Sequence, residues 1–321
     1  MSVIKTNIDE AIARVYDWKD RNISYSSVPG GITNPNFKIN VDGKNFFLKI
    51  PGEGTDFINR ENCHLANTIA AETGVGPKVH YYFADTGVEI FEWLEGYSPL
   101  AFDEIVDEEV LTKVITEISR YHNSGKVLPV KSTLFEQAWD MIDRAKDCDY
   151  APPWDDRMKV LLRQIEEAVN FDGIDFKPCH NDFWVNNMMY NRKTKDLKFI
   201  DFEYASMNDP YAELALGATH TLGEAGDMFL CKLYHGGEFN ERGYAKIKLY
   251  QIVCDIKWSY WALQQMVNSE VKFDYFSWYA GKIARLQYLW QDSRLDYWLN
   301  LLNHKPLFKR KKAENNRGAN S

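Results

Sequence analysis

A short polar segment near the middle of the chain has the residue types that phosphoryl transfer to a hydroxyl group requires. His180, Asp182 and Asn187 fit the pattern H-x-D-x-x-x-x-N, which is the spacing of a kinase catalytic loop. In that pattern the aspartate accepts the hydroxyl proton and the asparagine binds a metal ion. Asp201 follows the mostly apolar run 197–200, and a hard cation that bridges phosphates prefers such a carboxylate. We therefore predict Asp182 as the catalytic base, with Asn187 and Asp201 as ligands of Mg²⁺.

Each of these residues also has an ordinary structural interpretation. His180 taken alone could be a buried histidine that bonds to the backbone, and Asp201 could be a turn residue. The order of the segments favours catalysis, because the loop comes first, a short hairpin over residues 188–200 follows, and the aspartate comes directly after it. The motifs together therefore predict an active site of the kinase type.

Residues upstream of this loop provide the groups with which a kinase binds a nucleotide. Lys49 lies on a predicted strand, where it would hold the phosphates of ATP, and Glu61 lies on the next predicted helix, where it would pair with Lys49. The turn before the strand is a candidate phosphate loop, although it does not match G-x-G-x-x-G. The loop residues predicted to contact ATP are Gly31, Thr33 and Asn34. Without the other motifs, Lys49 would be a solvated surface lysine and the loop only a turn.

The end of the predicted N-terminal sheet has the position of a kinase hinge. Glu92 and Leu94 lie between the last predicted strand and the helical part of the chain. We predict that their backbone groups bond to the adenine ring of ATP. The alternative is that these residues simply end a strand.

Two regions of different secondary structure must position these residues. Alternating apolar and polar residues predict strands before Gly96, and helical periodicity dominates after it. The segments expected to be regular are a helix over 1–22, hairpin strands over 37–41 and 45–50, a helix over 57–73, hairpin strands over 79–84 and 88–93, helices over 103–124, 134–148 and 156–171, a strand pair around 188–202, and mostly helix from 209 onward. This order predicts an α+β fold with two lobes.

The same division predicts the organisation into domains. We expect a nucleotide-binding N-terminal lobe over residues 1–95, with an antiparallel sheet and one main helix. A larger, mainly helical lobe over 96–308 would carry catalysis and substrate binding. Residues 309–321 form a basic tail, for which a solvated, flexible terminus is favoured over a site for an anionic partner.

The overall composition indicates which classes of partner the chain is suited to bind. The formal net charge of −8 and the pI near 5.5 argue against nucleic acid and are compatible with a small cationic substrate. The five cysteines are scattered without a C-x-x-C pair, so neither a disulfide framework nor a zinc site is predicted. We expect a cytoplasmic protein, because no secretory signal is visible and no apolar run approaches the roughly 18 residues of a membrane span. No feature of the sequence predicts an oligomeric state.

Taken together, these motifs resemble those of the aminoglycoside phosphotransferase and choline kinase superfamily, and most of all those of bacterial choline kinases. The likeness extends over about residues 28–294 and is specific over 179–215. The matching segments are His180–Asp182 with Asn187, Ile200–Ala205, Met207–Pro210 and Glu213–Ala215. The resemblance implies a protein-kinase-like fold, Mg-ATP as donor, and a hydroxyl group of a small, usually cationic, substrate as acceptor. Two departures are that aspartate is common where Glu213 stands, and that the phosphate loop cannot be matched residue by residue.

The residues that would select the substrate lie mostly in the helical C-terminal part. Trp258 and Trp261 are three positions apart on one face of a predicted helix, and they resemble the W-x-x-W element with which choline kinases enclose a trimethylammonium group. Such a group donates no N–H hydrogen bond and is bound by aromatic faces, at roughly 0.5–2 kcal/mol per contact. Glu203, Tyr204 and Tyr279 are further predicted members of this site. The ordinary interpretation of the tryptophan pair is core packing, but the matched catalytic motifs favour a choline site.

Other substrates and functions stay open at this point. Ethanolamine kinases share most of the fold, and thiamine is another cationic acceptor. An aminoglycoside kinase needs clusters of carboxylates, whereas the acidic residues of the C-terminal part, such as Asp255, Glu270 and Asp274, are scattered. A protein kinase is disfavoured because Glu203 replaces the DFG glycine and no A-P-E element follows. A non-catalytic nucleotide- or cation-binding module is disfavoured because the catalytic residues are all present.

Overall fold

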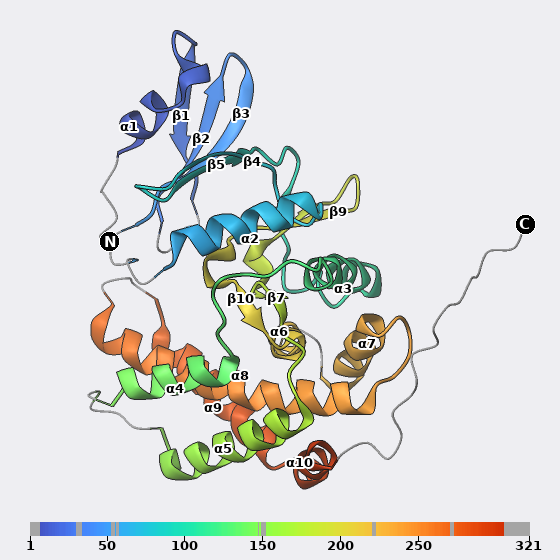
Figure 1. The fold of residues 1–321 in the computed structure, drawn as a ribbon. Coiled ribbons are helices and arrows are strands. Elements are labelled where there is room, and N and C mark those ends of the chain that lie inside the picture. The colour runs from blue at the N-terminus through green and yellow to red at the C-terminus, as the bar shows by residue number, and fades with distance from the viewer. Residues whose placement is uncertain are drawn as a thin grey trace, which may run out of the picture.

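The fold combines a small antiparallel sheet near the N-terminus with a larger helical part (Figure 1). The computed structural model describes residues 7–29, 34–52, 55, 58–146, 148, 152–219, 223–269 and 273–304. Gly31, Thr33 and the basic tail over 309–321 lie outside the described residues. The arrangement confirms the α+β, two-lobed, protein-kinase-like fold predicted from the sequence. None of the described helices is both long and apolar enough to span a membrane.

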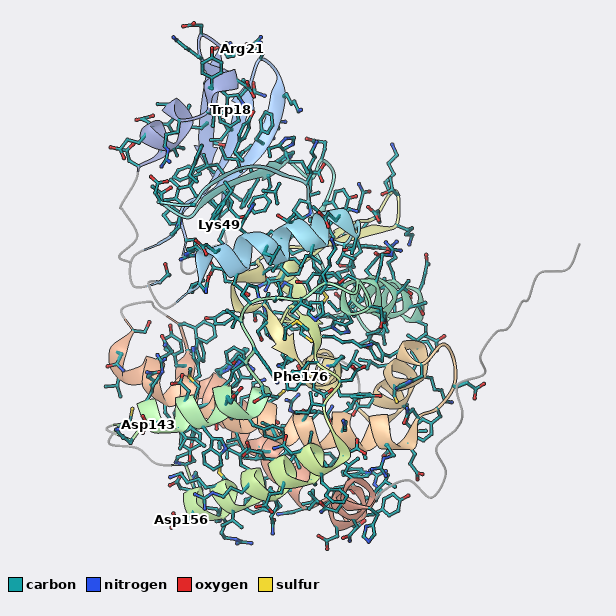
Figure 2. The ribbon with its side chains drawn as sticks, viewed as in Figure 1. Trp18, Arg21, Lys49, Asp143, Asp156 and Phe176 are labelled. Carbon is teal, nitrogen blue, oxygen red and sulfur yellow. The ribbon has the colours of Figure 1, made fainter. Side chains whose placement is uncertain are left out.

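The N-terminal part is built on a sheet of five strands in the order β1-β2-β3-β5-β4. Its elements are α1 (Ile8–Ala13), η1 (Tyr16–Trp18), β1 (Ile23–Ser27), β2 (Asn36–Val41), β3 (Lys44–Lys49), α2 (Arg60–Glu72), β4 (Val79–Phe83) and β5 (Val88–Glu92). One face of the sheet buries Leu48 and Ile90 in an apolar cluster that includes Trp18. Because side chains alternate along a strand, Lys49 points to the other face, beside the start of α2 (Figure 2).

The N-terminal elements differ from the sequence predictions in three places. The helix predicted over 1–22 ends at Ala13 and is followed by the short turn η1. Strand β1 was not predicted, because three of its five residues are serines and the alternation of Ile23 and Tyr25 with them is too short to stand out. Helix α2 begins at Arg60 rather than near residue 57, since the Asn59 side chain accepts the Asn62 N–H and caps the helix there.

The C-terminal part is organised around the long helix α8 (Glu241–Asn268). Its other helices are α3 (Glu108–His122), α4 (Leu134–Arg144), α5 (Asp155–Asp172), α6 (Pro210–Ala218), α7 (Glu224–Tyr234), α9 (Tyr275–Trp290) and α10 (Leu295–Asn303). Helix α8 packs against α4, α6, α9 and α10 (Figure 1). It is buried on almost all sides along most of its length, and four of its charged residues are buried as well: Lys246, Lys248, Asp255 and Lys257. The second half of α8 carries Trp258 and Trp261.

Two small sheets hold the catalytic segment between the N-terminal sheet and the helices. Their strands are β6 (Ser98–Pro99), β8 (Met188–Asn191) and β9 (Asp196–Phe199) in one sheet, and β7 (Lys177–Cys179) with β10 (Ser206–Asn208) in the other. Strand β7 ends directly before His180, and β9 ends two residues before Asp201. The turns η2 (Val185–Asn187) and η3 (Phe202–Tyr204) complete the segment. The ends of these strands therefore bring the predicted catalytic residues close together.

Candidate active site

The predicted base and metal ligands lie together at these strand ends. The Asn187 side chain donates from Nδ2 to Asp182 Oδ2 at 2.9 Å and to the Asp182 carbonyl at 3.1 Å. The Asn187 carbonyl accepts the Ile200 N–H at 3.0 Å, which brings Asp201 next to this pair. The Asn187 amide thus fixes the Asp182 carboxylate, and its Oδ1 atom and the Asp201 carboxylate are oxygen donors of the kind that Mg²⁺ prefers.

The two carboxylates differ in electrostatic environment. Burial raises the pKa of Asp182 above its ordinary value, and the neighbouring Asp201 carboxylate adds to this effect. Burial also disfavours the charge of Asp201, but Lys49 outweighs burial and holds the pKa of Asp201 below its ordinary value. The shifts suit separate tasks, because a proton acceptor needs affinity for the proton and a metal ligand must stay ionised.

The imidazole ring of His180 bonds to the backbone on both sides of the predicted site. His180 is fully buried, its Nε2 atom bonds to the Ile200 carbonyl at 2.8 Å, and its Nδ1 atom accepts the Asp182 N–H at 3.2 Å. The ring therefore ties the base to the residue before Asp201. His180 is a buried histidine bonded to the backbone, and in that position it orients the catalytic loop.

Glu213 on α6 accepts hydrogen bonds from the backbone of the same loop. Its Oε1 atom accepts the Asn181 N–H at 2.7 Å, and its Oε2 atom accepts the His180 N–H at 3.1 Å and bonds to His122 Nε2 at 2.7 Å. Asn181 has a left-handed backbone with φ of 64°, which turns both N–H groups toward Glu213. Burial opposes ionisation, but the His122 bond and the backbone donors hold the pKa of Glu213 below its ordinary value.

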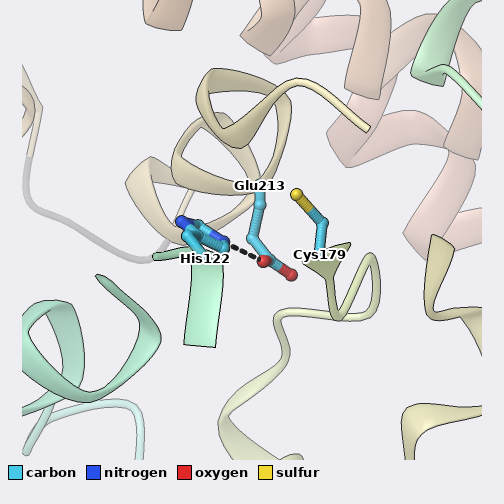
Figure 3. A group of neighbouring side chains, drawn as sticks. All are labelled: His122, Cys179 and Glu213. Carbon is cyan, nitrogen blue, oxygen red and sulfur yellow. Dashed lines mark hydrogen bonds and ion pairs between the residues drawn. The ribbon is translucent and has the colours of Figure 1, made fainter. Parts of the chain in front are cut away.

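The cluster of His122, Cys179 and Glu213 has the residue types of a metal site, and their ligand atoms lie within 4.8 Å of one another (Figure 3). Both carboxylate oxygens of Glu213 are already occupied by the loop and by His122. Burial raises the pKa of the Cys179 thiol well above its ordinary value, which disfavours the thiolate that a metal requires. The cluster therefore supports the catalytic loop and is not the metal site of the enzyme.

Lys49 faces two carboxylates at the boundary between the lobes. Its Nζ atom lies 2.7 Å from Asp201 Oδ1 and 3.0 Å from Glu203 Oε1. Arg60 Nη1 lies 2.7 Å from the same Glu203 oxygen. Burial opposes the charge of Lys49, but the two carboxylates raise the pKa of Lys49 above its ordinary value. Glu203 thus joins two cations of the N-terminal lobe beside Asp201, whereas the sequence predicted Glu203 among the substrate contacts.

The predicted ion pair between Lys49 and Glu61 does not form. Because α2 begins at Arg60, Glu61 lies in its first turn and points to solvent. The face toward Glu203 is occupied by Arg60 and Cys63, which are three positions apart on the helix. Glu203, from the segment after the metal aspartate, therefore takes the place that the sequence assigned to Glu61.

The predicted phosphate loop is only partly described, whereas the predicted hinge is described in full. Asn34 donates to Glu203 Oε1 at 2.9 Å and accepts the Gly52 N–H at 3.0 Å, so its side chain links the loop to the Lys49 network. The Glu92 N–H donates to the Lys78 carbonyl at 2.9 Å, and the Leu94 carbonyl accepts the Tyr97 N–H at 3.3 Å. Adenine contacts at the hinge would therefore use the Glu92 carbonyl and the Leu94 N–H.

A connected set of aromatic rings extends from the catalytic loop to α8 and α9. We call it the aromatic group, and its members are Trp184, Trp258, Trp261, Tyr275 and Trp278. Ring centroids are 5.5 Å apart for Trp258 and Trp261, 5.7 Å for Trp261 and Tyr275, 6.4 Å for Trp261 and Trp278, and 5.3 Å for Trp184 and Trp278. The predicted Trp258 and Trp261 are therefore joined to the loop that carries Asp182.

The two predicted tyrosines lie outside this set. Among the described residues, no ring contact connects Tyr204 or Tyr279 with the aromatic group. Tyr279 packs against the main core of the helical lobe, and Tyr204 is 43% exposed in η3. The face of α9 that meets α8 near Trp261 carries Trp278 rather than Tyr279, because neighbouring helix positions point about 100° apart.

Comparison with known proteins assigns the chain to a family. A model of the choline/ethanolamine kinase family matches residues 25–224. The chain belongs to this family. Its members are small-molecule phosphotransferases that act on an alcohol group, and the chain is an enzyme of this class.

Individual relatives support the assignment along most of the chain. Protein LicA of Haemophilus influenzae is 29% identical over 266 residues, which cover 79% of this chain and 77% of LicA. A choline/ethanolamine kinase family protein of Mesorhizobium loti has a similar structure, with a TM-score of 0.78, 23% identity, and coverage of 92% of this chain and 98% of that chain. The choline kinase LicA of Streptococcus pneumoniae aligns with a TM-score of 0.72 at 22% identity, over 87% of this chain and 98% of that chain.

Several residues of the site were not identified from the sequence. Trp184 lies within the catalytic motif, where its position two residues after Asp182 was the available signal. Trp278 differs from Tyr279 only by helix phase, which the sequence does not fix. Arg60 and His122 act through partners far along the chain, Glu203 and Glu213, so no local pattern indicated them.

Proposed function

We propose that this chain phosphorylates the hydroxyl group of choline with Mg-ATP and so produces phosphocholine and ADP. The observation that carries the proposal is the continuity between catalytic loop and aromatic group: Trp184 follows Asp182 by two residues, and its ring centroid is 5.3 Å from that of Trp278. A trimethylammonium group has no N–H donor and binds to aromatic faces. A choline molecule held there would present its hydroxyl, two carbons from the nitrogen, toward Asp182.

We infer that ATP binds between the N-terminal sheet and the catalytic loop. Lys49 would contact its phosphates, while Glu203 and Arg60 hold the lysine in place. The hinge at Glu92 and Leu94 would bond to adenine. Residues 1–95 are then the nucleotide-binding lobe and residues 96–308 the catalytic and substrate-binding lobe.

The chemistry follows from the positions of three side chains. Asp182 orients the choline hydroxyl and accepts its proton, while the hydroxyl oxygen forms a bond to the γ-phosphorus and the bond from that phosphorus to ADP breaks. Asn187 and Asp201 would hold Mg²⁺, which neutralises phosphate charge. The Asn187 bond to Asp182 keeps the base in place, and such positioning supplies much of the acceleration in reactions of this type.

Ethanolamine is the alternative substrate within the same family. Its primary ammonium has three N–H donors and favours oxygen acceptors over aromatic faces. Asp255 on α8 is the buried carboxylate in the same helix as Trp258, but Arg285 already binds both of its oxygens, at 2.6 and 2.5 Å. The same pairing disfavours an aminoglycoside, which needs several free carboxylates.

The test is to measure ADP release with Mg-ATP and each of four acceptors: choline, ethanolamine, thiamine and kanamycin. We expect the largest kcat/KM with choline. A higher kcat/KM with another acceptor would overturn the choice of substrate and leave the family intact. Absence of turnover with all four would contradict the proposed reaction and favour a non-catalytic binding module.

A further inference from the structure

One buried lysine beside the aromatic group has no carboxylate partner among the residues that the structure describes. Lys257 on α8 is only 5% exposed, and its Nζ atom donates to Gln137 Oε1 at 2.8 Å. Within the described ranges, no carboxylate lies at ion-pair distance from it. The other buried lysines of α8 are paired: Lys246 lies 3.1 Å from Asp172, and Lys248 lies 2.7 Å from Asp227.

The Lys257 ammonium instead lies on an aromatic ring of the proposed substrate site. Its Nζ atom is 4.4 Å from the centroid of the Trp258 ring, the distance of a cation–π contact. Burial lowers the pKa of Lys257, while the Asp182 carboxylate favours its charged form. The amino group of Lys257 therefore lies on the ring of the tryptophan that we propose for binding the cation of the substrate.

Burial of a cation is costly, and with no carboxylate of the described residues at ion-pair distance this cost is offset in part by the Gln137 bond, the Trp258 ring and the more distant Asp182 charge. An indole ring attracts a cation through the negative charge of its faces, and a cation on one face weakens the attraction for a second one. Two like charges near one ring in a partly dry site also repel each other directly. Lys257 therefore opposes the binding of a positively charged substrate, while it leaves a neutral molecule of the same shape unaffected.

We propose that Lys257 is a specificity-determining residue that limits the affinity of the aromatic group for quaternary ammonium substrates by placing its own ammonium on Trp258. This inference rests on the proposed function as a choline kinase. It differs from that function in predicting that one lysine can be removed to improve choline binding.

The test compares Lys257→Met, which removes the charge but keeps the length, with Lys257→Arg, which keeps the charge. We measure the KM for choline at saturating Mg-ATP and the inhibition constant of 3,3-dimethyl-1-butanol, the neutral carbon analogue of choline. Lys257→Met should lower the choline KM about five- to tenfold and leave the inhibition constant of the analogue within about twofold. Lys257→Arg should keep the ratio of these two constants close to that of the wild type.

A control with the same geometry is available in the N-terminal lobe. Lys38 Nζ lies 4.4 Å from the Trp93 ring centroid, away from the aromatic group, so Lys38→Met should not change the choline KM. Thermal melts establish that each variant is folded, and binding of tetramethylammonium by calorimetry should tighten in Lys257→Met even if turnover falls.

Three results would overturn the inference while choline remains a substrate of the wild type. They are an unchanged choline KM in Lys257→Met, equal changes for choline and its neutral analogue, and tetramethylammonium binding that weakens. A wild-type enzyme that does not phosphorylate choline would instead overturn the proposed function, so the two failures are distinct.

Discussion

The bonds of Glu213 predict a measurable cost when its charge is removed. Oε1 accepts the Asn181 N–H, and Oε2 accepts the His180 N–H and bonds to His122. In Glu213→Gln, one oxygen becomes an NH₂ group that cannot accept a hydrogen bond. Whichever way the amide is turned, one backbone N–H of the catalytic loop loses its acceptor in a fully buried place.

The size of this effect can be estimated from the lost bonds. A buried donor without a partner costs about 1–3 kcal/mol, and loss of the charge weakens the remaining bonds by about 1 kcal/mol. We therefore expect the free energy of unfolding to fall by roughly 2–4 kcal/mol. Because the loop carries Asp182, kcat should also fall by at least about tenfold. This corresponds to a rise of about 1.4 kcal/mol in the activation free energy, caused by misplacement of Asp182.

Urea denaturation and steady-state kinetics at saturating substrates measure the two quantities. Glu104→Gln is a matched control, because it breaks a pair with Arg192 on the surface and should cost less than about 1 kcal/mol. Glu213→Asp keeps the charge and should retain more activity than Glu213→Gln. If Glu213→Gln has an unchanged kcat and its free energy of unfolding falls by less than about 0.5 kcal/mol, Glu213 does not hold the catalytic loop in place.

Four further predictions concern the remaining parts of the site. Asp182→Asn should lower kcat by about 10²–10⁴-fold and leave ATP affinity nearly intact, and unchanged turnover would exclude it as the base. Burial raises the pKa of Asp182, and the base must be ionised to act, so kcat/KM should fall as the pH is lowered through a midpoint above the ordinary pKa of aspartate. A midpoint at the ordinary pKa of aspartate would contradict this prediction. Trp258→Ala and Trp261→Ala should raise the KM for choline by about tenfold but not that for ATP, whereas equal effects would indicate core packing. Arg60→Met should raise the KM for ATP several-fold, and the exposed Glu61→Gln should not.

Local sequence patterns predicted those elements and residues whose position depends on interactions between residues close together in the sequence. The spacing within 180–187 and the hairpin before Asp201 bring the predicted base and the predicted metal ligands together, because β8 and β9 are consecutive strands. Alternation along β3 placed Lys49 on the face opposite the buried Leu48. The turn at Asp42 also formed as its sequence indicated, with positive φ values of 50° and 89° at Asp42 and Gly43.

Contacts that depend on helix phase or on distant partners were not predictable in this way. The cap at Asn59 shifts α2 and turns Glu61 to solvent, so Glu203 bonds to Lys49 instead. The choice of Trp278 over Tyr279 depends on how α9 packs against α8. Helix α8 is buried on almost all sides, and its sequence therefore gave no sign that Lys257 would be the buried lysine without a carboxylate.

The most direct test of the central claim is to follow the reaction of choline with Mg-ATP by ³¹P NMR. We predict a phosphomonoester signal of phosphocholine that appears together with ADP, depends on Mg²⁺, and is absent with Asp182→Asn. ADP formation without phosphocholine, or equal phosphocholine production by the Asp182→Asn variant, would contradict the account.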